Sequence, residues 1–300
     1  MAQGILITGS TGQLGIEMRR LDWTNVFHPV FLDRTELDLT DAAAIVRLVE
    51  DGYGGAPFAA VVNAGAYTAV DRAETEQILA WETNAMAPAA FAEACAKTGT
   101  PLIQLSTDYV FSGEREGSWE VDDETKPINV YGASKLGGEL AIRASGARHV
   151  IIRTAWVVSA HGQNFLKTML KLGASRDALN VVADQFGSPT SAADLAVAVQ
   201  TIALAMARDA KLASATVHFS NAGETHWADF ASEIFRQSAL RGGPFAEVGP
   251  IAGSDYPTPA KRPSNSLLNH REIEARFGIV PRPWKVALGD ILDELLGAAK

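Results

Sequence analysis

The chain has 300 residues, and its 47% hydrophobic content suffices for a full core, which excludes a disordered protein. Its net charge of −9 argues against binding of nucleic acid or of an anionic membrane. The single cysteine, Cys95, excludes an intramolecular disulfide and lies in an Ala-rich helical pattern that favours a buried small side chain over a nucleophile. No apolar run is long enough for a membrane span, so we expect a cytoplasmic protein.

Short apolar runs recur along the chain, and a helical pattern follows each of them. The runs are continuous rather than alternating, which is typical of parallel strands that helices cover on both faces. This order predicts right-handed crossovers and an α/β fold with a doubly wound, Rossmann-like parallel sheet. We predict strands at 4–9, 30–34, 59–66, 101–111, 149–158 and 215–221.

The intervening helical patterns lie at 15–21, 41–51, 80–99, 132–145, 164–175, 192–209 and 284–299. After residue 156 the alternation loosens, and the tail is rich in Pro, Gly and Ser. We therefore predict a dinucleotide-binding domain at 1–155, to which the chain returns around 190–221. A smaller C-terminal substrate-binding lobe would comprise 156–189 and 222–300.

The first predicted strand runs into TGSTGQLG, which places Gly9, Gly12 and Gly15 before a helix. Glycines there permit a tight turn and let a pyrophosphate approach the helix N-terminus. An ordinary strand–helix turn is the alternative, but the position at the first strand–helix junction favours a nucleotide. Asp33 closes the second predicted strand, where a carboxylate would accept hydrogen bonds from the adenosine ribose.

Two later strand ends carry small or hydroxyl side chains. Residues 64–66 (Ala-Gly-Ala) leave room for a flat ligand at the carboxyl edge of the sheet, whereas Asp71 and Glu74 are equally well read as helix-start carboxylates. The sequence Ser-Thr-Asp at 106–108 ends the fourth predicted strand. The Thr107 hydroxyl could donate to a substrate oxygen or merely cap the local backbone.

The stretch NVYGASK sets Tyr131 and Lys135 four positions apart, on one face of a predicted helix. An isolated pair of this kind usually belongs to a solvated helix face. Here it follows several features of a nucleotide-binding sheet and indicates an acid–base pair. An ammonium about 4 Å away would lower the phenol pKa by up to roughly three units, toward neutral pH.

Together these motifs resemble the extended short-chain dehydrogenase/reductase family. TGSTGQLG, NAGAYTAVDRAE, STDYVFSG, NVYGASK and RTAWVV fall in that family's order over the first 158 residues. NFLKTML, ADQFGSPT and YPTPAKRPSNSLLN extend the resemblance, to its sugar-nucleotide reductases, over nearly the whole chain. The resemblance implies transfer of a hydride from NADPH or NADH to C4 of a dTDP-linked 4-keto-6-deoxy sugar.

The resemblance also implies residue roles. Tyr131 would protonate the C4 alkoxide, Lys135 would hold the nicotinamide ribose, and Thr107 would hydrogen-bond the keto oxygen. Asp108 and Trp156 would lie beside the sugar, and Asn84 would be structural. The residues expected around the cofactor, in addition to Tyr131 and Lys135, are Gly9, Gly12, Gln13, Leu14, Gly15, Asp33, Arg34, Asp38, Leu39, Ala66, Tyr67 and Thr68.

Asp33 and Arg34 pull the choice of cofactor in opposite directions. The carboxylate favours NADH and repels the extra phosphate of NADPH, whereas the guanidinium can hold that phosphate bidentately. We expect the enzyme to use both cofactors. Arg262 in AKRPSNS joins a cation to Pro-fixed backbone, so it either contacts the nucleotide diphosphate or belongs to a surface loop.

Some family members are dimers bridged by a metal through carboxylates. Glu17 and Glu294 could serve here, but Ala193 stands where a third acid would be expected. The histidines show no ligand spacing, so we predict no metal and either a monomer or a homodimer.

Other members of this fold leave alternatives open. A sugar-nucleotide dehydratase would need a further acid where Tyr109 stands. A 4-epimerase or another 4-ketoreductase is not excluded by Thr107. The last alternative, a non-catalytic NADP-binding regulatory subunit, fits less well because Thr107, Tyr131 and Lys135 are all present.

Overall fold

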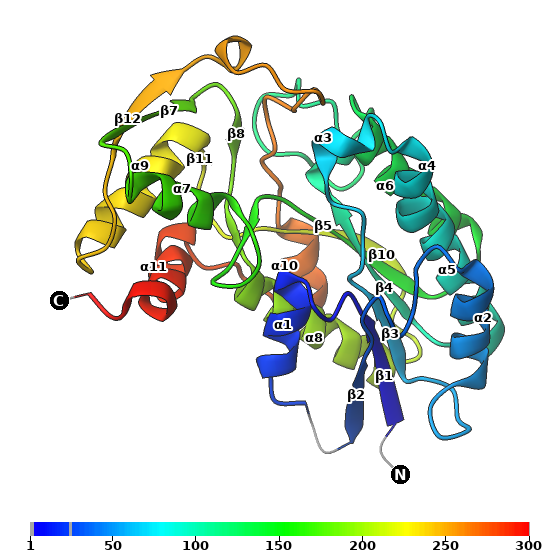
Figure 1. Ribbon diagram of the computed structural model, residues 1–300. Helices are drawn as coiled ribbons and strands as arrows, with labels where there is room; N and C mark the ends of the chain where they lie inside the picture. The colour runs from blue at the N-terminus through cyan, green and yellow to red at the C-terminus, as the bar shows by residue number, and fades with distance from the viewer. Residues whose placement is uncertain (1–2, 24–25, 300) are drawn as a thin grey trace.

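The computed structural model describes residues 3–23 and 26–299 and centres on a six-stranded parallel sheet (Figure 1). The strand order is β10-β5-β4-β3-β1-β2, which confirms the predicted doubly wound α/β fold. The chain moves outward from β1 to β2 and then returns past β1 to form β3. Open α/β sheets bind ligands at such a reversal. The strands are β1 (Gln3–Thr8), β2 (Phe27–Phe31), β3 (Ala60–Asn63), β4 (Leu102–Thr107), β5 (His149–Thr154) and β10 (Ala215–Phe219).

Helices cover both faces of the sheet (Figure 1). Successive side chains of a strand face opposite ways, so Ile5 and Ile7 pack under α1 and α8 while Leu6 packs under α2 and α5. All three side chains are fully buried, which explains the continuous apolar run. One face carries α1 (Gln13–Arg20), α8 (Ala192–Arg208) and α10 (Arg271–Phe277), and the other carries α2 (Ala42–Asp51), α5 (Ala87–Thr98) and α6 (Val130–Ala144).

The strands end earlier than predicted. β2 stops at Phe31, and β4 stops at Thr107, where a 3-10 turn, η2 (Asp108–Val110), begins. The predicted strand 149–158 is interrupted because Trp156 has a φ of +50°, and only a short strand, β6 (Val157–Val158), follows it. These breaks bring polar side chains to the carboxyl edge of the sheet.

The helix predicted at 80–99 is divided into three parts. They are α4 (Gln77–Trp81), a π-helical turn η1 (Glu82–Met86), and α5 (Ala87–Thr98). Pro88 in the first turn of α5 lacks an N–H group, which loosens the hydrogen-bond ladder there. Asn84 lies in η1, where its amide pairs with both backbone groups of Tyr67 and with Ser134 of α6.

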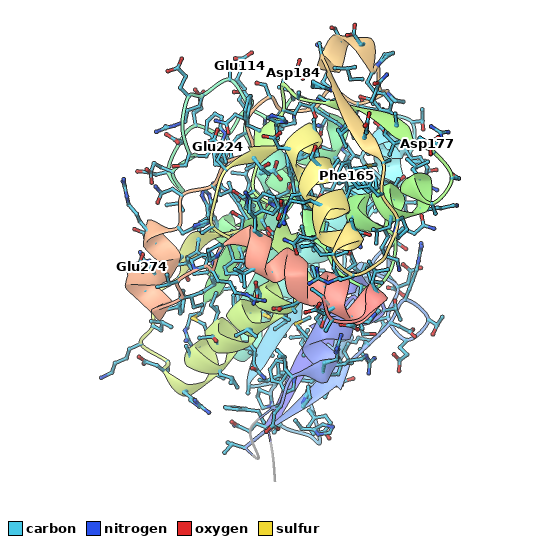
Figure 2. All side chains as sticks on the ribbon, turned by 90° about the vertical axis from the view of Figure 1, so that its left-hand side faces the viewer. Glu114, Phe165, Asp177, Asp184, Glu224 and Glu274 are labelled. Carbon is cyan, nitrogen blue, oxygen red and sulfur yellow. The ribbon has the colours of Figure 1, made fainter. Side chains whose placement is uncertain are left out.

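A smaller lobe forms its own core from segments late in the chain. α7, α9 and α11 enclose buried Phe230, Phe235 and Leu292. Figure 2 faces this lobe, with α11 running below α9 and Phe165 beside α9. Its elements are α7 (Phe165–Gly173), β7 (Ala178–Val182), β8 (Phe186–Gly187), β11 (Thr225–His226), α9 (Trp227–Ala239), β12 (Glu247–Ile251) and α11 (Trp284–Leu296).

Between the lobe's segments the chain returns to the sheet through α8 and β10, and α10 packs against both of them. The remaining short elements are α3 (Val70–Ala73), β9 (Thr190–Ser191) and η3 (Gly253–Asp255). Within the described residues, no helix combines the length and hydropathy that crossing a membrane requires. Cys95 is buried as predicted, and burial raises the pKa of its thiol to about 12.

Candidate active site

A cleft of about 550 Å³ lies where β1, β3, β4 and β5 end, at the reversal of the sheet order. Every residue predicted to contact the cofactor lines it, and these residues come from four separate chain segments. They are Gly9, Gly12, Gln13, Leu14, Gly15, Asp33, Arg34, Asp38, Leu39, Ala66, Tyr67, Thr68, Tyr131 and Lys135.

The glycine loop at the mouth of α1 tolerates no side chains at two positions. Gly9 has a φ of +70°, and a Cβ there would lie 2.7 Å from the carbonyl of Ala64. A Cβ on Gly15 would lie 2.3 Å from the Gly9 oxygen. Gly12 precedes α1 and offers no side-chain cap, so the first N–H groups of this helix are available to an anion in the cleft.

Gln13 connects this loop to the smaller lobe. Its Oε1 accepts hydrogen bonds from Ser159 at 3.1 Å and from Asn164 at 2.8 Å, and its Nε2 donates to the Val157 carbonyl at 3.5 Å. These partners occupy the amide of Gln13. A phosphate in the cleft would therefore meet the backbone of Gln13 rather than its side chain.

Asp33 and Arg34 lie in the loop after β2, two and three residues beyond the strand rather than at its end. Asp33 Oδ1 accepts hydrogen bonds from the Thr35 hydroxyl at 2.6 Å and from the Thr35 N–H at 2.7 Å. These bonds lower the pKa of Asp33 below its usual range, so the carboxylate is ionised. Thr40 engages Asp38 in the same way and lowers its pKa.

Tyr131 and Lys135 lie one turn apart at the start of α6, whose first turn is capped by the Asn129 side chain. The predicted effect of Lys135 on the phenol is wrong in this structure. Burial and the Asp108 carboxylate raise the pKa of Tyr131, and contact with the Thr107 hydroxyl offsets only part of that rise. The Lys135 ammonium instead donates to the Leu105 carbonyl at 2.6 Å, and burial lowers its pKa to about 8.

Thr107 and Asp108 adjoin Tyr131 but lie outside the residues that line the cleft. The Thr107 hydroxyl donates to Asp108 at 3.0 Å and accepts from the Tyr109 N–H at 3.1 Å, so it does cap the local backbone. Asp108 is buried and also accepts from the Ser266 hydroxyl. Burial raises the pKa of Asp108 to about 6. Sequence analysis missed Ser266, which is distant in sequence.

Trp156, predicted to lie beside the sugar, and Arg262, predicted to contact the diphosphate, are held by long-range partners. The Trp156 indole stacks on Trp227 with ring centroids 3.5 Å apart, and a Cβ on Gly187 would come within 2.6 Å of it. Arg262 binds Asp71 bidentately, at 2.9 and 3.1 Å. Asp71 lies in the first turn of α3, as the reading of a helix-start carboxylate predicted. It also binds Arg262 in the C-terminal tail of the chain.

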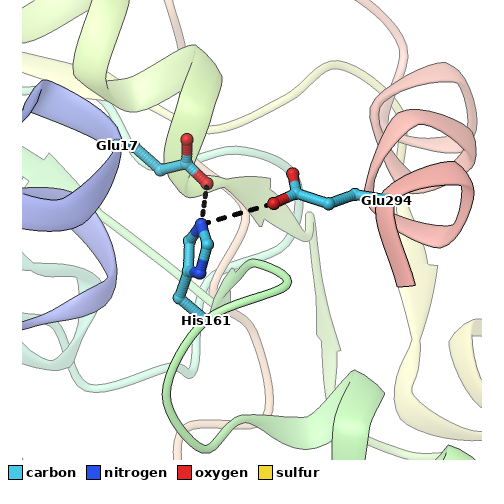
Figure 3. A group of neighbouring side chains, drawn as sticks. All are labelled: Glu17, His161 and Glu294. Atoms are coloured by element: carbon cyan, nitrogen blue, oxygen red, sulfur yellow. Dashed lines mark ion pairs between the residues drawn. The ribbon is translucent and has the colours of Figure 1, made fainter. Parts of the chain in front are cut away.

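Glu17 and Glu294 meet, as Figure 3 shows, with His161 between them. His161 Nε2 lies 3.5 Å from Glu17 and 3.6 Å from Glu294. Arg20 donates to both Glu294 oxygens at 2.9 Å and lies 3.4 Å from Glu17. These groups are of the types that bind divalent metals, but Arg20 already supplies a cation to both carboxylates. The expectation of no metal stays a prediction.

The family model for the RmlD substrate binding domain matches residues 3–296. The chain is 41% identical over 282 residues to a dTDP-4-dehydrorhamnose reductase of Sinorhizobium fredii, a match that covers 94% of each chain. The chain belongs to the dTDP-4-dehydrorhamnose reductase family.

Solved structures of this family have the same fold. A dTDP-4-dehydrorhamnose reductase from Clostridium acetobutylicum matches with a TM-score of 0.89 at 36% identity, over 98% of this chain and 99% of that chain. The dTDP-4-dehydrorhamnose reductase from Bacillus anthracis, solved in complex with NADP, has a TM-score of 0.88 at 32% identity, over 98% and 100%. The resemblance to the extended short-chain dehydrogenases/reductases, and to their sugar-nucleotide reductases, is thereby confirmed.

Proposed function

We propose that this protein reduces the C4 keto group of dTDP-4-dehydro-L-rhamnose to give dTDP-L-rhamnose, with NADPH or NADH as the reductant. The observation that carries the proposal is the position of Tyr131 and Lys135 in one cleft with the glycine loop, in a chain of this reductase family. The phosphate-binding loop then holds the dinucleotide in the same cleft in which Tyr131 meets the keto group of the substrate.

The residues at the cleft fit a dinucleotide. The uncapped N-terminus of α1 and the absence of side chains at Gly9 and Gly15 suit a pyrophosphate. Thr154 Oγ1 lines the cleft and is buried without a hydrogen-bond partner among the described residues, so a ligand group would satisfy it. A bound reduced nicotinamide supplies the hydride.

Tyr131 holds the proton that the product alcohol needs. Because burial and Asp108 raise its pKa, the phenol is fully protonated at neutral pH, which is the form a donor requires. Thr107, next to the phenol, orients the keto oxygen. Lys135, with a pKa of about 8, is mostly charged at pH 7 and would donate to the ribose hydroxyls of the bound cofactor.

The lobes divide the two ligands between them. The region comprising 1–155 and about 190–221 holds the dinucleotide, and the smaller lobe formed by 156–189 and 222–300, apart from α10 on the sheet, holds the sugar nucleotide. Trp156 packs against the sugar ring. Arg262 leaves Asp71 to contact the diphosphate, for which a guanidinium offers bidentate geometry. The protein acts in the cytoplasm, where nucleotide sugars and reduced nicotinamides are formed, as a monomer or a homodimer.

The test is direct. The protein is mixed with dTDP-4-dehydro-L-rhamnose and NADPH, the absorbance of reduced nicotinamide is followed, and the product is identified by mass spectrometry and NMR. We expect one equivalent of NADPH to be consumed for each dTDP-L-rhamnose formed. Substrate consumption without NADPH oxidation would favour an epimerase or a dehydratase. NADPH binding without turnover at high protein concentration would favour a regulatory subunit.

A further inference from the structure

α6 carries a third ionisable side chain in line with Tyr131 and Lys135. Glu139 follows Lys135 by four residues and so shares its helix face. It is fully buried, with only 1% of its surface exposed, and the proposed reaction gives it no role. A buried carboxylate one turn from a catalytic ammonium therefore requires an explanation.

The Glu139 carboxylate accepts hydrogen bonds from three side chains. Arg153 of β5 donates to both of its oxygens, at 2.8 and 2.9 Å, and Arg143 donates to Oε2 at 2.8 Å. Ser106, which lines the cleft, donates to Oε1 at 2.5 Å. Arginine and hydroxyl donors together lower the pKa of Glu139 despite its burial, so the group is an anion.

Two consecutive residues at the end of β4 bind the Lys135 ammonium and the Glu139 carboxylate. The Leu105 carbonyl accepts from Lys135, and the next residue, Ser106, donates to Glu139. Burial alone pushes a lysine toward its neutral form, by several pKa units in deeply buried cases. The Glu139 charge opposes that push on Lys135 from one helical turn away, and Arg153 forms its ion pair with Glu139.

We propose that Glu139 is a positioning residue that keeps the Lys135 side chain charged at the cleft, with Arg153 keeping Glu139 itself ionised. This inference rests on the proposed function of Lys135 as the group that holds the nicotinamide ribose. The other groups around the pair are Tyr131 and Arg143 of α6, Asp108 of η2, Arg153 of β5, and His218 of β10, which is neutral because burial lowers its pKa to about 3.

The test measures the pH dependence of NADPH affinity, by nicotinamide fluorescence, and of kcat/KM. Glu139→Gln keeps the shape of the side chain and removes its charge. We expect Lys135 to lose its proton at lower pH, so the loss of affinity and of kcat/KM at alkaline pH should begin about one pH unit lower than in the wild type. Near pH 6, where Lys135 is still charged, the variant should approach the wild type.

Glu139→Gln leaves Arg153 buried without a counter-charge and could unfold the protein. Glu139→Gln/Arg153→Met removes both charges and should show the same alkaline shift in a folded protein. Arg143→Met is the matched control, because it removes a half-exposed partner of the same carboxylate and should move the alkaline limb by less than about 0.3 pH unit.

An alkaline limb unchanged in both Glu139 variants, or failure of both to fold, would leave the carboxylate a purely structural role and overturn the inference. The fluorescence titration needs no sugar substrate. A wild type that binds NADPH but does not reduce dTDP-4-dehydro-L-rhamnose would count against the proposed function, while the shift in NADPH affinity would still decide the role of Glu139.

Discussion

The sheet and the smaller lobe hold their functional side chains by different means. Around the sheet, Gly9, Thr107 and Tyr131 stand at strand ends or helix starts, where local backbone geometry fixes them. In the lobe, Trp156 depends on stacking against Trp227, and Arg262 depends on Asp71 from the opposite end of the chain. Changes in the first region should therefore act on the chemistry and the cofactor, and changes in the second on affinity for the sugar nucleotide.

The largest expected effect lies at the strand–helix edge. Tyr131→Phe removes the proton donor and keeps the ring, so kcat should fall roughly a hundredfold or more. Circular dichroism and the melting temperature should show an intact fold. Tyr109→Phe is the matched control, because this neighbouring phenol stacks edge-on at 5.6 Å and should matter little. Equal turnover of Tyr131→Phe and the wild type would rule out the donor assignment.

The next effect is expected in the lobe, at Gly187. Gly187→Val places a Cβ within 2.6 Å of the Trp156 indole, which has to move. We expect KM for the sugar nucleotide to rise by about tenfold or more, a cost of at least about 1.4 kcal/mol, with NADPH affinity unchanged. In the control Gly249→Ala, the new Cβ would lie 2.7 Å from the Asn180 amide oxygen, at the end of a side chain, and 3.8 Å from the Leu179 carbonyl. A selective loss of NADPH affinity in Gly187→Val would contradict the assignment of the sugar nucleotide to the smaller lobe and of the cofactor to the sheet.

Arg262 tests whether the tail contacts the substrate. Arg262→Ala should raise KM for the sugar nucleotide roughly tenfold, because a charged hydrogen bond contributes about 1.5–3 kcal/mol. Asp71→Asn weakens the same ion pair but leaves the guanidinium in place, so its KM should stay near the wild-type value. If Arg262→Ala and Asp71→Asn had similar KM values and similar losses of thermal stability, the Arg262–Asp71 ion pair would have only a structural role.

The smallest effect concerns cofactor choice. Arg34→Ala should weaken NADPH binding by up to about tenfold and leave NADH nearly unaffected, since a half-exposed charge contact contributes on the order of 1 kcal/mol. Fluorescence titrations with both cofactors provide the measurement. Equal weakening of NADPH and NADH would indicate that Arg34 does not reach the extra phosphate.

The features predicted best are those that depend on neighbouring residues. The glycine loop, the segment at 66–68 and the Tyr131–Lys135 pair each occupy one short stretch, and the parallel sheet brings these stretches together. Prediction failed where a distant partner decides the outcome. The spacing of Tyr131 and Lys135 in the sequence reveals neither the Leu105 carbonyl that binds Lys135 nor the burial that raises the Tyr131 pKa.

The role of Glu139 was missed although it continues the four-residue series of Tyr131 and Lys135, because its main partner lies on another element. Its partner Arg153 stood within the quoted motif RTAWVV, but only the packing of α6 against β5 shows that the two charges meet. His161 reached Glu17 and Glu294 for the same reason, because the loop before α7, α1 and α11 converge in space.

Because of the π-helical turn η1, the number of residues between α4 and α5 cannot change without altering the structure. A π turn closes its hydrogen bonds one residue later than an α turn, so it contains an inserted residue. Deleting one residue from 82–86 would close the turn into a regular α-helix and remove the bulge in which Asn84 lies. The Asn84 amide would then turn away from Tyr67 and Ser134, and the loop that lines the cleft would lose its tie to α6. Most surface turns absorb such a deletion, but this one cannot.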